Sequence, residues 1–119
     1  LPAYCTSMGR VLLAALPVAE ARQILEAAPR PSRTPLTVTD LDALTAILTE
    51  TRARGYALID QEVELGLRSI AVPLTNARGQ TVAALNVGLS AGAEPVSVLA
   101  ERYLPALRRV QAELAQVLT

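Results

Sequence analysis

Residues 54–74 read R-G-Y-A-L-I-D-Q-E-V-E-L-G-L-R-S-I-A-V-P-L, and this stretch decides the fold. Gly55 follows Arg52 and Arg54, which is typical of a helix end, because glycine accepts the left-handed conformation and cations favour the negative end of a helix. The β-compatible residues after it predict one strand over 56–59 and another over 67–74, separated by an acidic turn. The stretch therefore predicts a helix that leads into a sheet.

A third β-compatible segment, residues 81–89, follows the turn sequence N-A-R-G at 76–79 and predicts an antiparallel hairpin. Alternate residues of a strand lie on opposite faces of a sheet. One face is expected to be small and partly polar, and the other purely aliphatic. The first face contains Ser69, Asn86 and Gly88, and the second contains Ile70, Leu85 and Val87.

Three helices are expected before the sheet and one after it. The first is predicted over 6–16 with Thr6 or Ser7 as its cap, and the second runs from Pro17 until Pro29 forbids continuation. A capping pattern at Thr39 and Asp42 begins the third, after an extended, proline-rich connection. The last helix carries an apolar stripe of Val96, Leu99, Tyr103, Leu107, Val110, Leu114 and Val117. This order predicts an α+β fold.

Composition limits the possible functions of this chain of 119 residues, which has the size of one domain. Its 11 cationic side chains are balanced by 11 acidic ones, whereas a domain that grips phosphates carries a basic excess. With one cysteine, an intrachain disulfide is impossible, and the reducing cytoplasm is the expected location. No apolar run is long enough to span a bilayer, so no membrane is expected as a partner.

Catalysis and metal binding lack the usual residues. The sequence contains neither His nor Lys, so Cys5 and Ser7 have no base of the common Ser-His, Cys-His or Ser-Lys kind. Asp60, Glu62 and Glu64 can be interpreted as a metal or acid/base cluster, but acids in a turn are more often solvated, and a contact from Asp60 to a ligand hydroxyl is a third interpretation. We expect no enzyme, no cofactor and no metal site.

Two features can form a binding site for a small molecule. Ser69 and Asn86 among small residues resemble the floor of a sparsely polar pocket, although each can instead bond to backbone or face solvent. The helix start at 6–9 offers free N–H groups and a positive dipole end that suit a carboxylate. Thr6 and Ser7 can alternatively serve only as helix caps.

Several motifs occur in an order that resembles a known family. They are T-S-M-G-R at 6–10, R-G-Y-A-L-I-D at 54–60, E-L-G-L-R-S-I-A-V-P at 64–73 and A-A-L-N-V-G at 83–88. Together with L-P-A-Y-C at the start, they resemble the effector-binding domain of IclR-type bacterial transcriptional regulators. Within that family the chain is most similar to regulators of aromatic acid breakdown through the β-ketoadipate pathway.

The resemblance implies a GAF-like sensor, in which helices flank a curved antiparallel sheet and a small organic acid is the effector. The positions that match effector-binding positions of the family are Ser7, Met8, Ile59, Asp60, Leu67, Ser69, Asn86 and Gly88. Three positions depart from patterns of the family. The position of Ile59 is often acidic there, and members that bind very small keto acids tend to carry a hydroxyl or thiol at the positions of Asn86, which is larger here, and Gly88, which has no side chain. The effector is therefore expected to differ from a very small keto acid and to be an aromatic or dicarboxylic acid.

The resemblance also implies partners. Family members form homodimers or homotetramers, and they bind DNA through an N-terminal helix-turn-helix domain that these 119 residues do not contain. The first strands of the sensor also precede the L-P-A-Y segment in the family. We therefore expect residues 1–119 to be the ligand-sensing part of a longer regulator, and the alternative is an assembly module without a ligand.

Overall fold

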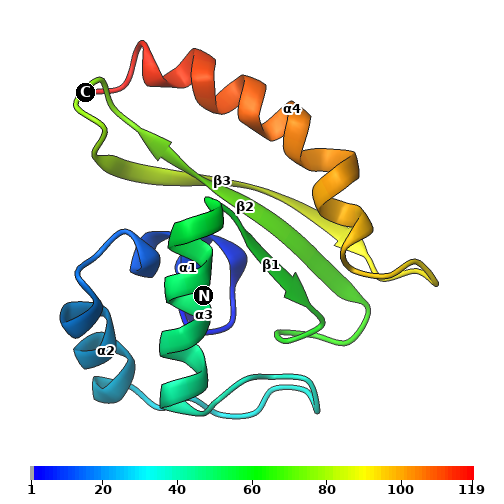
Figure 1. The fold of residues 1–119 in the computed structure, drawn as a ribbon. Helices are drawn as coiled ribbons and strands as arrows, with labels where there is room; N and C mark the ends of the chain where they lie inside the picture. Colours follow the sequence, from blue (N-terminus) through cyan, green and yellow to red (C-terminus); the bar gives the residue numbers. More distant parts are fainter. Residues whose placement is uncertain (1) are drawn as a thin grey trace.

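A computed structural model describes residues 2–119, which fold into four helices and three strands (Figure 1). None of the helices in this range is long and apolar enough to cross a membrane. The elements in chain order are α1 (Ser7–Ala14), α2 (Val18–Ala27), α3 (Leu41–Arg54), β1 (Ala57–Asp60), β2 (Leu67–Thr75), β3 (Thr81–Ser90) and α4 (Val98–Ala115). The predicted α+β class is confirmed.

The three strands form one antiparallel sheet in the order β1-β2-β3. Ser69 is paired with Ile59 on one side and with Gly88 on the other, and Ala71 is paired with Asn86. Paired residues share a face, so this register confirms that Ser69, Asn86 and Gly88 lie together. The predicted face is therefore present as a continuous surface across all three strands.

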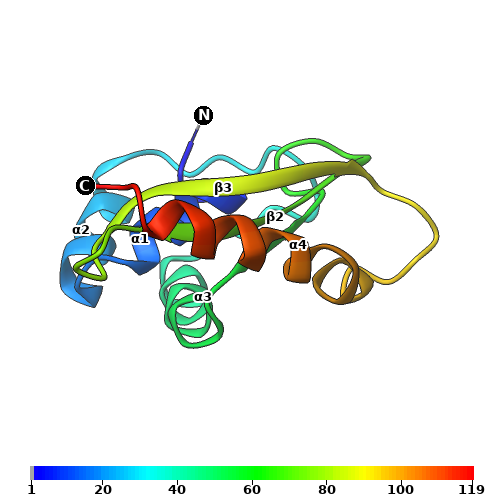
Figure 2. The same ribbon diagram turned by 90° about the horizontal axis from the view of Figure 1, so that it is seen from above.

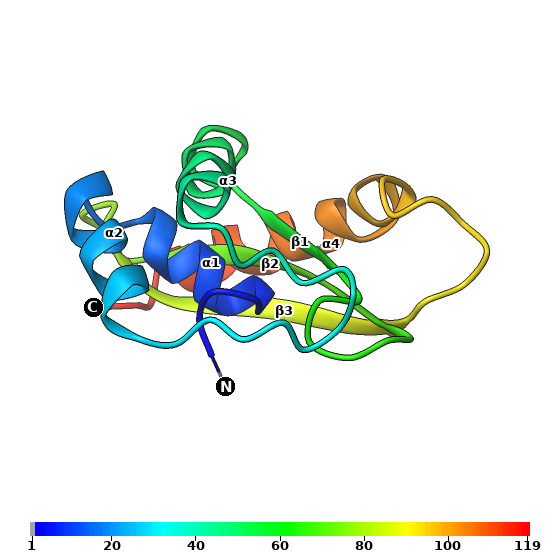
Figure 3. The ribbon, with the colours of Figure 1, turned by 90° about the horizontal axis from the view of Figure 1, so that it is seen from below.

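Each face of the sheet is covered by a different helix. On the aliphatic face Ile70 and Val72 pack against Leu107 of α4, which runs along the strands (Figure 2). On the opposite face Val11 of α1 packs against alanines of the sheet, and small side chains there allow the helix to approach closely. α2 and α3 pack against α1 on that same side (Figure 3).

Helix and strand ends follow local polar contacts. Thr6 caps α1 as predicted, because its hydroxyl accepts the Gly9 amide at 3.2 Å. Gly55 ends α3 in the left-handed conformation with φ 81°.

The prediction that Thr39 caps α3 is wrong, since the Asp40 carboxylate accepts the Ala43 amide at 2.9 Å and fixes the start one residue later. The bounds of β1 also shift one residue toward the C-terminus from the prediction.

The apolar stripe predicted for α4 is only partly correct. Leu99 and Leu107 are buried, whereas Val110 and Val117 are 39% and 70% exposed. Gln111 faces the sheet instead of Val110 and donates to the Pro73 carbonyl at 2.6 Å. After Leu107 the buried side of α4 therefore passes through Gln111 rather than Val110 and continues at Leu114 and Ala115, which are half-buried.

Candidate functional site

The N-terminal turn of α1 lies over the small-residue face of the sheet. Val11 of α1 packs on Ala57 and Ala71, which come two residues before Ile59 and two after Ser69. Ser7 precedes Val11 by four residues and so lies on the same side of the helix. The C-terminal half of α1 borders Pro73 and the β2–β3 turn, so its first turn points toward the other end of the strands, where Ile59 and Ser69 lie.

Ser7 is the unusual residue of this turn. Only 1% of its surface is exposed, and among residues 2–119 its hydroxyl is the single buried side-chain polar atom without a hydrogen-bond partner. An unpaired buried hydroxyl costs about 1–3 kcal/mol, so such atoms are rare in folded proteins. The helix also provides no partner for the amides of Ser7 and Met8, because amides of the first turn have no helical carbonyl four residues earlier in the chain. The turn therefore has a hydroxyl and two amides without a partner in the helix.

The other predicted residues form a floor and an apolar rim. Ile59 is buried, Ser69 is half-buried, and Asn86 and Gly88 are exposed. A Cβ atom placed on Gly88 would meet no atom within 4 Å, so the space above β3 is open. Met8 and Leu67 are the exposed apolar members of the set, with 37% and 39% of their surfaces exposed. The structure thus brings seven of the eight predicted residues to one side of the sheet.

Asp60 is the exception. It is paired with Arg68 across the strands, on the face that α4 covers, and its carboxylate accepts the Arg68 Nε–H at 2.8 Å. Arg68 also donates to the Glu94 carbonyl at 2.7 Å. The expectation that Asp60 contacts an effector is not supported by this geometry, because an ion pair holds its carboxylate on the opposite face.

The acidic residues of the β1–β2 turn diverge. Asp60 pairs with Arg68, Glu62 is buried against Arg10, and Glu64 is exposed. Within residues 2–119, no group of three or more Cys, Asp or Glu side chains is arranged to hold a metal ion. The interpretation of this turn as a metal or acid/base cluster is therefore wrong, since each carboxylate has a different environment.

Cys5 is fully buried, and burial raises the pKa of its thiol. A raised pKa keeps the thiol protonated at neutral pH, so we expect Cys5 in the folded chain to react with iodoacetamide at least about tenfold more slowly than a free cysteine. Mass spectrometry of timed samples at pH 7.5 measures this rate. The same reaction in denaturant is the control and should proceed at the rate of an exposed thiol, whereas equally fast labelling of the native chain would contradict the burial.

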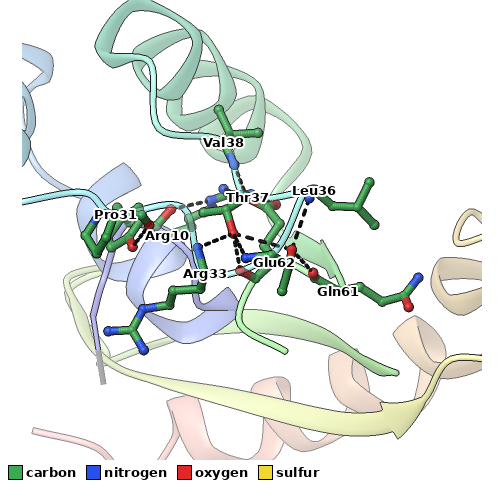
Figure 4. A network of polar contacts seen from close by, with 10 residues as sticks. Arg10, Pro31, Arg33, Leu36, Thr37, Val38, Gln61 and Glu62 are labelled. Carbon is green, nitrogen blue, oxygen red and sulfur yellow. Dashed lines mark hydrogen bonds and ion pairs between the residues drawn. The ribbon is translucent and has the colours of Figure 1, made fainter. Parts of the chain in front are cut away.

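A buried polar network joins α1 to two loops, and sequence reasoning missed it (Figure 4). Arg10 makes two hydrogen bonds to Glu62, at 2.9 and 2.7 Å, and a third to the Tyr4 carbonyl at 3.0 Å. Glu62 Oε1 also accepts the Val38 amide at 3.0 Å. The available signal was the position of Arg10, three residues after Ser7 and therefore on the inner side of the predicted helix.

One cavity lies along α1, next to α3 and the β2–β3 turn. It measures about 750 Å³ and is lined by α1, α3 and the β2–β3 turn, with Leu12, Arg52 and Gln80 among its residues. None of the eight predicted residues lines it. The candidate site is instead an open surface in this chain, since Asn86, Gly88 and Leu67 on it are exposed.

Comparison with known proteins places this geometry in a family. Residues 1–116 match the family model described as "Bacterial transcriptional regulator IclR C-terminal", and Leu1 of that segment lies outside the described residues. The chain belongs to the IclR family. The members of this family are transcriptional regulators, not enzymes.

Two curated relatives are similar over nearly the whole chain. The Pca regulon regulatory protein of Pseudomonas putida is 47% identical over 118 residues, which cover 99% of this chain and 40% of the relative. The p-hydroxybenzoate hydroxylase transcriptional activator of Acinetobacter baylyi is 39% identical over 114 residues, which cover 96% of this chain and 42% of the relative. The chain thus spans less than half the length of these IclR regulators.

Solved structures show the same fold. The inducer-binding domain of the PobR transcription factor from Acinetobacter, a double mutant in complex with 3-hydroxybenzoic acid, matches with a TM-score of 0.93 and 36% identity, covering 99% of this chain and 67% of that one. The C-terminal domain of the Escherichia coli regulator KdgR matches with a TM-score of 0.81 and 33% identity, covering 97% of this chain and 72% of that one. The IclR effector-domain fold is therefore established for this chain.

Proposed function

We propose that this chain is the effector-binding domain of an IclR-type regulator and that its effector is a hydroxylated aromatic acid or a dicarboxylic acid of aromatic catabolism. The observation that carries this proposal is the buried Ser7 hydroxyl without a partner, at the start of α1 and over the face that contains Ser69. A ligand acceptor would satisfy this hydroxyl and remove its cost.

The chemistry of the face suits such an acid. A carboxylate is stabilised at a helix start by the free amides of Ser7 and Met8 and by the helix dipole, without a basic side chain. An aromatic ring fits apolar contacts from Ile59 and Leu67. Ser69 can donate a hydrogen bond to a ring hydroxyl or a second carboxylate. We propose that the site comprises Ser7, Met8, Ile59, Leu67, Ser69, Asn86 and Gly88.

Two relatives support an aromatic acid as the effector. The PobR domain, a double mutant, was solved with 3-hydroxybenzoic acid, and it is 36% identical to this chain over 99% of this chain and 67% of its own. The Acinetobacter relative is named as the transcriptional activator for p-hydroxybenzoate hydroxylase. An effector of the same chemical class agrees with the apolar rim and few polar groups of the face described above.

Regulation would follow from differential binding. We propose that the chain acts within a homodimer or homotetramer in the cytoplasm and that a separate domain of the parent regulator contacts DNA. An acid that binds one quaternary arrangement more tightly shifts the population toward it. Couplings of about 1–3 kcal/mol are typical, which corresponds to changes in DNA affinity of about 5- to 150-fold.

The test is a binding screen of the chain against protocatechuate, 4-hydroxybenzoate, β-ketoadipate, glyoxylate and pyruvate. An acid present at about 100 times its Kd should stabilise the fold by about 2.7 kcal/mol, which appears as a saturable rise in the thermal midpoint. Isothermal titration then gives the Kd and the stoichiometry. The methyl ester of the binding acid is the control, since it keeps the ring but lacks the charge and should bind more weakly. If none of the five acids shifts the midpoint, the proposal fails for this panel of effectors.

A second function, assembly without a ligand, is favoured by the exposed apolar residues of α4. Val110 of α4 and Val117, two residues beyond its end, have 39% and 70% of their surfaces exposed. Such residues can pack against a second copy of the chain. This function would be favoured over sensing if the chain associates with increasing concentration in analytical ultracentrifugation and no acid of the panel changes its thermal midpoint.

A further inference from the structure

We propose that Glu62 is a positioning residue for the candidate effector site and that it acts through Arg10. This inference rests on the proposed function. Both side chains are buried, with 7% and 3% of their surfaces exposed, and they form the Arg10–Glu62 pair at the centre of the network in Figure 4. Neither belongs to the set of residues that faces the effector. Their effect on binding would therefore be indirect, through the elements that they join.

The first step is the hold on α1. Arg10 donates from Nη1 and Nη2 to the two Glu62 oxygens and from Nε to the Tyr4 carbonyl, just before the helix. A two-pronged guanidinium–carboxylate pair fixes direction as well as distance. Arg10 lies one turn after Ser7, so the pair fixes the rotation of the turn that carries the Ser7 hydroxyl and amide.

The second step is the hold on the β1–β2 turn. Glu62 lies three residues after Ile59, and the Gln61 amide beside it donates to the Leu67 carbonyl at 2.9 Å. Gln61 has a φ of 60°, a conformation that a residue other than glycine adopts only when its surroundings enforce it. The position of this turn therefore determines where Ile59 and Leu67 stand relative to α1.

The third step is the connection between α2 and α3. The hydroxyls of Thr34 and Thr37 donate to the carbonyls of Gln61 and Glu62, and the Val38 amide donates to the Glu62 carboxylate. The β1–β2 turn is thus held by contacts from α1 on one side and from the α2–α3 connection on the other. Movement of Glu62 would displace the helix start and the strand ends together.

Stability alone does not account for such a pair. Buried ion pairs lose much of their attraction to desolvation, and apolar replacements of both partners are often neutral or stabilising, whereas removal of one partner costs several kcal/mol. What the pair adds is a defined geometry between α1 and the β1–β2 turn. That geometry sets the spacing between Ser7 and the floor of the candidate site.

The experiment compares Glu62→Gln with the double variant Arg10→Met/Glu62→Gln. In both, the glutamine oxygen can still accept the Val38 amide, and the double variant leaves no unpaired buried charge. We expect the single change to lower the thermal midpoint. The double change should restore the midpoint to near that of the wild type, but its Kd for 4-hydroxybenzoate, or for the panel acid that binds, should remain at least about tenfold weaker.

Gln111→Ala on α4 is the matched control. It removes the hydrogen bond to the Pro73 carbonyl and should lower the midpoint while leaving the Kd unchanged. A second readout is hydrogen exchange in the double variant, where the amides of the first turn of α1 and of residues 61–66 should exchange faster while α4 stays protected. If Glu62→Gln does not fold, Thr37→Val takes its place; it loses the hydroxyl contact to the Glu62 carbonyl and, with it, the contacts from the Arg33 and Thr34 amides.

The outcomes separate the two proposals. A wild-type chain that binds no acid would overturn the proposed function, and the positioning role with it. A wild-type chain that binds, beside a double variant with the same Kd and the same exchange pattern, would overturn only the positioning role. A double variant with a restored thermal midpoint but a weaker Kd would support the positioning role. If the pair only stabilised the fold, the double variant would regain the midpoint and the affinity together.

Discussion

Replacement of Ile70 by alanine should lower the free energy of unfolding by about 2–5 kcal/mol. Ile70 is completely buried, and it packs between the sheet and α4 with Val72 and Leu107. The truncation would leave a cavity that the surrounding strands and helix cannot fully close. Urea denaturation followed by circular dichroism measures the loss, with the slope of the transition checked for two-state behaviour.

Val82→Ala is the control for this prediction. Val82 belongs to the adjacent strand, but 47% of its surface is exposed, so its truncation should change the free energy of unfolding by only about 0.5 kcal/mol. Equal losses for both variants would mean that α4 does not cover the sheet as described. A large loss for Ile70 alone would mean that the stability of the sheet depends on the packing of α4 against it.

The placement of the candidate site could be predicted from strand periodicity. Side chains alternate strictly between faces, and the aliphatic residues Ile70 and Val87 have to share the covered face, so Ser69 and Gly88 share the other one. The turn at 76–79 alone does not give this register, because a shift between Leu74 and Thr75 separates it from the rest of the hairpin. Burial on the aliphatic side then decides which face the last helix covers. These are local rules, and they hold here because no bulge interrupts the strands between Leu67 and Leu74.

Helix details were less predictable, because several residues compete for the same role. Thr39 and Asp40 are both good caps, and only the observed bond from the Ala43 amide to Asp40 distinguishes them. On α4, steps of three and four residues both fit the pattern after Leu107, and Gln111 rather than Val110 reaches the sheet. Here a polar contact to the Pro73 carbonyl prevails over apolar periodicity.

Long-range pairs could not be predicted from one sequence. Arg10 and Glu62 are separated by 52 residues, and nothing in either segment indicates the partner. The ion pair of Asp60 with Arg68 also joins two strands, but the face on which Asp60 lies follows from alternation, because Ile59 before it points to the opposite face. Charged residues have many possible partners in a chain with 11 cations and 11 anions, so their pairing becomes visible only in the folded structure.

Ser7→Ala should raise stability and weaken effector binding at the same time. The variant removes a buried hydroxyl that has no partner, so the free energy of unfolding without effector should rise by about 1 kcal/mol. If the effector carboxylate accepts a hydrogen bond from this hydroxyl, the loss of a charge-assisted bond should weaken binding by about 1.5–3 kcal/mol, or roughly 10- to 150-fold. Urea denaturation and isothermal titration measure the two effects separately.

Thr6→Ala, at the preceding residue, gives the contrast that makes the result interpretable. The Thr6 hydroxyl accepts the Gly9 amide at the helix start, so its loss should lower the free energy of unfolding by about 1 kcal/mol. Two neighbouring hydroxyls would then move stability in opposite directions, because one has a partner within the chain and the other does not. A Ser7→Ala variant that is less stable than the wild type and binds the acid with unchanged affinity would show that this hydroxyl supports the fold and takes no part in recognition.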